Sequence, residues 1–110
     1  MDILPRTNEA FIPIDRLLKY ALNPEVDYNK AIAFENALGY NLDNAEELIE
    51  QVKKELFTSH AKRKDDFGYG TRYEVIMDIT GRNGKTAKVL TSWIDDIKTG
   101  EMRLTTIHVD

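Results

Sequence analysis

A small set of polar and aromatic side chains has the chemistry needed to cleave a phosphodiester by acid–base catalysis. The candidate catalytic residues are Lys30, Thr91, Thr106 and His108, and the candidate substrate-binding residues are Arg72, Tyr73 and Trp93. Histidine exchanges protons near neutral pH, lysine or arginine stabilises a charged phosphorane, and an aromatic ring stacks on a base. These residue types are compatible with a nuclease that needs no metal ion.

Each of these residues also has an ordinary structural explanation. A histidine late in the last strand, such as His108, is commonly a partly exposed strand residue, Trp93 would commonly belong to the core, and threonine is frequent in strands. Lys30 falls in the first turn of an expected helix, where a cation opposes the helix macrodipole. Lys30 is either a surface lysine without a specific role or a lysine that binds an anion. Spacing alone does not make these residues an active site.

Other familiar sites are missing from the sequence. There is no cysteine, and the two histidines, His60 and His108, have no metal-ligand spacing. The glycines at 68–70 and 81–84 lack the strand–loop–helix context of a phosphate-binding loop, and no serine stands in a nucleophile elbow. We therefore expect no metal and no cofactor.

Composition indicates one small domain in the cytoplasm. The chain has 110 residues, of which 42% are hydrophobic, and this is enough for a small core. The first residues lack a secretory pattern, and no apolar run is long enough to span a membrane. A net charge of −4 disfavours nonspecific electrostatic binding to nucleic acid. The charge of the basic run 62–64 is balanced by the next two residues, Asp65 and Asp66.

Hydrophobic periodicity predicts three helices in residues 13–57, after a loosely held lead-in over 1–12. The first should begin at Asp15, use Leu17, Leu18, Ala21 and Leu22 as its apolar face, and stop at Asn23-Pro24. The second should begin at Asp27 and end at Gly39. The third should begin with an Asp43–Glu46 capping box and run to about residue 57.

After residue 70 the pattern alternates, which predicts strands over 72–80, 85–95 and 102–109, joined by turns at 81–84 and 98–100. Residues 61–66 could add a ragged edge strand. The expected fold class is α+β, with three N-terminal helices packed on an antiparallel three- to four-stranded β-meander (70–110), all within one domain, 1–110.

Alternation also predicts which side chains share a face of the sheet. Thr91 and Trp93 should lie together on the second strand of the meander. On the last strand Leu104, Thr106 and His108 should lie together, opposite Ile107 and Val109. One face should carry the helices, and the other should be partly open or covered by the N-terminal segment or a partner.

Short motifs along nearly the whole chain, residues 12–109, resemble an uncharacterised bacterial domain family with toxin-associated members. In the first half the motifs are Ile14-Asp15-Arg16-Leu17, Leu22-Asn23-Pro24, Asn29-Lys30-Ala31, Phe34, Leu38-Gly39-Tyr40 and Asn44-Ala45-Glu46-Glu47-Leu48. In the second half they are Tyr69-Gly70-Thr71-Arg72-Tyr73, Ala87-Lys88-Val89, Thr91-Ser92-Trp93-Ile94 and Arg103-Leu104-Thr105-Thr106.

This resemblance implies a layout similar to the barnase, EndoU, colicin and RelE class of ribonucleases. It further implies metal-independent RNA cleavage, with Lys30, Thr91, Trp93 and Thr106 at the family's recurrent positions. His108 departs from the pattern because an aromatic residue is expected there, and the acidic charge is a second departure. The alternative is a non-catalytic module that binds or inhibits a protein, linked to phage or mobile elements. The expected partner is accordingly RNA, or else an immunity or target protein.

Overall fold

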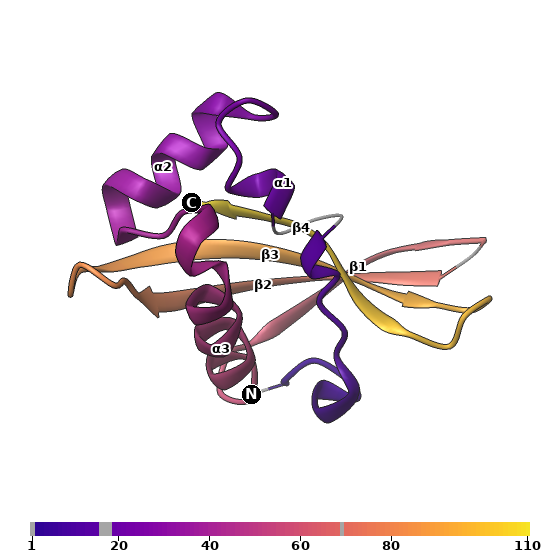
Figure 1. Cartoon of the computed structure of the whole chain (residues 1–110). Helices are drawn as coiled ribbons and strands as arrows, with labels where there is room; N and C mark the ends of the chain where they lie inside the picture. Colours follow the sequence, from indigo (N-terminus) through magenta and orange to yellow (C-terminus); the bar gives the residue numbers. More distant parts are fainter. Residues whose placement is uncertain (1, 16–18, 69) are drawn as a thin grey trace.

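The computed structural model describes residues 2–15, 19–68 and 70–110 and contains a four-stranded antiparallel sheet. Its strands follow one another in space as they do in sequence (Figure 1). They are β1 (Ala61–Phe67), β2 (Gly70–Thr80), β3 (Thr86–Asp96) and β4 (Met102–Val109). The predicted meander is confirmed, and the expected ragged edge is a strand of seven residues.

Helices and short helical turns precede the sheet along the chain, as expected for a mixed α+β fold. They are η1 (Thr7–Glu9), α1 (Lys19–Ala21), α2 (Tyr28–Leu38), η3 (Leu42–Asn44) and α3 (Ala45–Leu56). The predicted apolar face of the first helix is only partly covered by the structure, because Leu17 and Leu18 lie outside the described residues. The helical layer is therefore built mainly from α2 and α3.

The ends of α2 follow the sequence prediction, whereas the start of α3 does not. Asp27 caps α2 by accepting a hydrogen bond from the Lys30 amide at 3.2 Å, and Gly39 closes it with a φ of 76°. The predicted Asp43–Glu46 capping box is wrong. The box forms two residues earlier, between Asn41 and Asn44, because a 3₁₀ turn precedes α3.

One face of the sheet is covered by helices. In Figure 1, α3 crosses in front of β2, and α2 lies over β3 and β4. Alternate strand residues point into this layer and are fully buried, among them Val75, Met77, Ile79, Val89, Trp93 and Ile107. The intervening residues lie on the opposite face, which none of the described helices covers. We call this second face the open face.

A β-bulge in β4 overturns the predicted faces of the last strand. Ser92 pairs with Thr106 and Trp93 pairs with Leu104, so Thr105 is an extra residue in β4. The bulge reverses the alternation that follows it. Leu104 consequently shares the core face with Ile107, and Thr106 and His108 lie on the open face.

The N-terminal segment packs along the end of the helical layer. We expected a loosely held lead-in here; in the structure Leu4, Thr7 and Ile12 are buried. The backbone of Phe11 bridges β4 by a parallel pairing with Arg103, receiving one hydrogen bond from Leu104 and donating one to Met102. The segment therefore extends the sheet edge for one residue and closes the core beside Trp93.

Candidate functional site

Thr91 and Trp93 form a hydrogen-bonded pair inside the core. Both are fully buried. The Thr91 hydroxyl donates to the carbonyl oxygen of Val75 at 2.8 Å and accepts the indole N–H of Trp93 at 2.9 Å. These bonds satisfy the polar atoms of both side chains, so burial and packing are sufficient to explain the two residues.

Lys30 and Tyr73 also belong to the helix-covered side of the molecule. Tyr73 pairs with Trp93 in the sheet register and packs, half-buried, against the core. Lys30 is half-buried in the first turn of α2, which contacts the core face of β3 and β4. The seven candidates are thus divided between two sides of the sheet.

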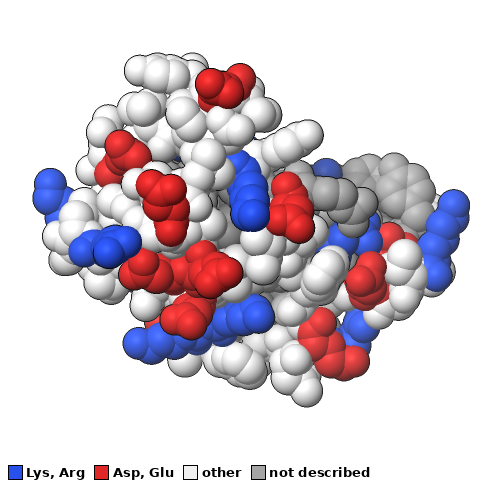
Figure 2. All heavy atoms as spheres, in the orientation of Figure 1, with Lys and Arg blue, Asp and Glu red and all other residues white. Residues whose placement is uncertain are grey.

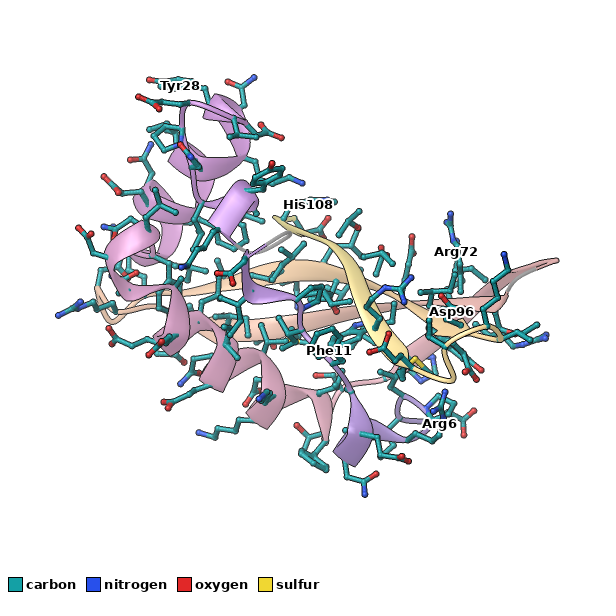
Figure 3. The ribbon with its side chains drawn as sticks, turned by 45° about the vertical axis from the view of Figure 1, so that its right-hand side comes forward. Arg6, Phe11, Tyr28, Arg72, Asp96 and His108 are labelled. Carbon is teal, nitrogen blue, oxygen red and sulfur yellow. The ribbon has the colours of Figure 1, made fainter. Side chains whose placement is uncertain are left out.

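The open face brings together the other three candidates and two residues that sequence reasoning missed. Arg72 and Glu74 come from β2, Ser92 from β3, and Thr106 and His108 from β4. Glu74, Ser92 and Thr106 form one row across three strands. Figure 3 shows Arg72 and His108 on the side of the sheet away from Arg6.

Strand geometry sets the spacing of this group. Neighbouring strands lie about 4.8 Å apart, which separates the backbones of Glu74 and Thr106 by about 10 Å. His108 lies two residues beyond Thr106, in the row of Ile76 and Leu90. Arg72, in the row of Ile94, lies on the other side of the Glu74 row, so the five side chains form a strip along the open face. We call Arg72, Glu74, Ser92, Thr106 and His108 the open-face cluster.

Glu74 and Ser92 could have been found from the sequence. The Asn-Gly turn fixes the register of the β2–β3 hairpin, and alternation then places both residues beside Arg72. The positions of Thr106 and His108 could not be found in this way, because nothing in the sequence marks Thr105 as a bulge.

Ion pairs surround the open-face cluster. The ammonium group of Lys64 lies 3.7 Å from Glu74, that of Lys88 lies 3.1 Å from Asp78, and the Arg103 guanidinium lies 3.1 Å from Asp96. These pairs balance much of the charge on this side of the sheet.

Asp96 is the last residue of β3, and its side chain stabilises the turn that follows. Its carboxylate accepts hydrogen bonds from the amides of Lys98 and Thr99 and from the side chain of Arg103. Partial burial alone would raise the pKa of Asp96, but these hydrogen bonds and the Arg103 charge outweigh it and lower the pKa. Asp96 is therefore a structural anchor of the β3–β4 turn.

The described residues contain no metal-binding group and no membrane span. Nowhere in 2–15, 19–68 and 70–110 do three histidine, cysteine or acidic side chains gather as metal ligands. Among the same residues, each helix is too short or too polar to cross a bilayer.

Comparison with known proteins assigns the chain to a family. A family model described as a domain of unknown function, DUF6883, matches residues 3–110. The chain belongs to this family. The match covers the helical layer, the sheet and nearly all of the N-terminal segment, so the DUF6883 domain is the whole structural unit described above. No curated protein and no solved structure matches the chain.

Proposed function

We propose that this DUF6883 chain is a ribonuclease that cleaves RNA without a metal ion on the open face of its sheet. One observation carries the proposal: the strand register and the β4 bulge gather a carboxylate, a guanidinium, an imidazole and two hydroxyls on the face that the described helices leave uncovered. This combination supplies a base, an acid and a stabiliser of negative charge.

The roles follow from the chemistry of the side chains. Glu74 accepts the proton of the ribose 2′ hydroxyl as its oxygen attacks the adjacent phosphorus. Arg72 stabilises the negative charge that develops on the phosphoryl oxygens. His108 donates a proton to the departing 5′ oxygen as the phosphorus–oxygen bond breaks. The products are a 2′,3′-cyclic phosphate and a free 5′ hydroxyl.

The family resemblance of the sequence motifs supports the same reaction, and it includes Thr106, which belongs to the open-face cluster. It differs in the remaining residues, since it implies Lys30, Thr91 and Trp93. Variants can distinguish the open-face cluster from the residues that the resemblance implies. Thr91 and Trp93 are fully buried, and Lys30 belongs to the helical layer.

The test is RNA cleavage in EDTA. Purified protein is incubated with transfer RNA and total RNA, beside Glu74→Gln, His108→Gln and a Lys98→Ala control in the exposed β3–β4 turn. Wild type and control should cleave equally, and the two site variants should lose about 100-fold or more of the rate. No cleavage by wild type, or equal cleavage by His108→Gln, would overturn the proposal. A Lys30→Ala variant tests the assignment that the resemblance implies.

A non-catalytic module that binds a protein is the second candidate. It is favoured by the ion pairs of Lys64, Lys88 and Arg103 and by the net charge of −4, which together weaken the attraction for phosphate. Ile76, 49% exposed on the open face, would then contact the partner. The expected result is no RNA cleavage and one stoichiometric partner from host lysate that Ile76→Asp no longer retains. Retention by Ile76→Asp counts against this candidate.

A further inference from the structure

A groove on the helical side of the molecule is separate from the open-face cluster. One half is a hollow of about 300 Å³ between the α1–α2 connection, α2 and η3, with Leu22, Ala31 and Ile32 in its lining. The other half is a hollow of about 430 Å³ against the first turn of α3. Leu42 and Asp43 line both halves, so the two hollows share one wall.

Leu42 is held toward solvent by the turn that carries it. The Asn44 side chain accepts the Asn41 amide at 2.7 Å, and the Asn41 side chain accepts the Asp43 amide at 2.9 Å. The Asn44 amide group donates to the Gly39 carbonyl at 3.0 Å, which fastens the turn to the end of α2. Leu42 consequently remains 41% exposed beside the apolar hollow. An apolar side chain fixed in this way is preorganised for a contact.

The rim of the groove is acidic. Five carboxylates line the two hollows, and Lys19 is the single cation among the lining residues that the structure describes: the carboxylates belong to Asp15, Glu35, Asp43, Glu46 and Glu47. Figure 2 shows acidic side chains gathered over α3 and the turn before it. Asp15 pairs with Lys19, and Glu47 pairs with Arg82.

Helix dipoles explain only part of this charge. Glu46 and Glu47 lie in the first turn of α3, where the dipole favours a carboxylate. Glu35 lies in the last turn of α2, where the dipole disfavours it, and no basic residue lies in that turn. Glu35 and Asp43 border the apolar hollow itself, so charge and apolar surface occur together at this point.

We propose that this groove binds a basic peptide segment of a protein partner. One apolar side chain of the segment fills the hollow between Leu22 and Leu42, and lysine or arginine residues beside it pair with Asp43 and Glu46. Charge complementarity selects this occupant, because nucleic acid or an acidic peptide would be repelled by the rim. The proposal does not rest on RNA cleavage by the open face.

Peptide selection tests the proposal without knowledge of the natural partner. A displayed library of short random peptides is selected on the immobilised protein, and enriched peptides are synthesised with a fluorophore and titrated by anisotropy. The expected consensus is one apolar residue flanked by lysine and arginine. Binding should weaken as salt rises, because the rim contacts are exposed charge pairs.

Matched variants locate the site. Leu42→Asp and Glu46→Lys should each weaken binding about tenfold or more, and Glu50→Lys, an exposed charge change on α3 outside the lining, should change it less than about twofold. All three positions are exposed, and unfolding curves confirm that the variants fold. Enrichment of peptides without basic residues, or equal binding by wild type and Leu42→Asp, overturns the proposal.

Discussion

At the scale of single residues, two of the seven side chains that suggested chemistry belong to the core. The resemblance implies Thr91 and Trp93 as site residues, yet both are fully buried and hydrogen-bonded to each other. A sequence pattern cannot distinguish a threonine that bonds a core indole from one that contacts substrate, since both occur on alternating strands. The difference depends on which face the helices cover.

The Thr91 hydroxyl should therefore matter for stability. Thr91→Val keeps the shape of the side chain but leaves the buried Trp93 indole N–H without its acceptor. We expect the free energy of unfolding to fall by about 1–3 kcal/mol. Urea denaturation measures this change, with Thr86→Val at an exposed strand position as the control. A difference between the two variants of less than about 0.5 kcal/mol would contradict the buried bond.

Asp96 should make stability depend on pH in the acidic range. Its pKa is lowered in the folded state, so its ionised form stabilises the fold above the unfolded pKa, and this contribution disappears as pH falls through the folded pKa. The stability difference between wild type and Asp96→Asn should therefore shrink between about pH 6 and about pH 2. Chemical denaturation across this range gives the difference, and a constant value would show that the carboxylate is not held by its turn.

At the scale of elements, the sequence predicted what local chemistry determines. The Asp27 cap, the Gly39 terminus and the Asn-Gly hairpin each depend on a few adjacent residues, and each forms as expected. The capping box of α3 and the β4 bulge were missed because they depend on how one element meets another. One extra residue, Thr105, is enough to move Thr106 and His108 to the opposite face.

The β2–β3 turn also depends on how one element packs against another, and a substitution can test this packing. A Cβ at Gly81 would lie 2.3 Å from the Leu38 carbonyl oxygen, at the end of α2. Gly81→Ala should therefore destabilise the protein by about 2 kcal/mol or more, since backbone must move. Gly68→Ala is the control, because a Cβ there meets nothing within 4 Å. Equal thermal unfolding of both variants would show that the turn and α2 are not packed as described.

At the scale of the whole molecule, the sheet separates two surfaces of different character. The helical side carries the acidic groove, and the open face carries the mixed-charge cluster. Periodicity was sufficient to predict a mixed α+β fold with an antiparallel meander, because helix and strand periods differ clearly along the chain. It was insufficient for the site, because the side of the sheet that remains uncovered is decided by the packing of α2 and α3.

The most direct test of this account is to map where RNA binds. Isotope-labelled protein is titrated with an RNA oligonucleotide whose 2′ hydroxyls are methylated, so that it binds without being cleaved. RNA binding at the open face should shift the nuclear magnetic resonance signals of Arg72, Glu74, Thr106 and His108 together and should leave the Trp93 indole signal in place. An absence of shifts, or shifts centred on Lys30 and the helical layer while the open-face signals remain unchanged, would contradict it.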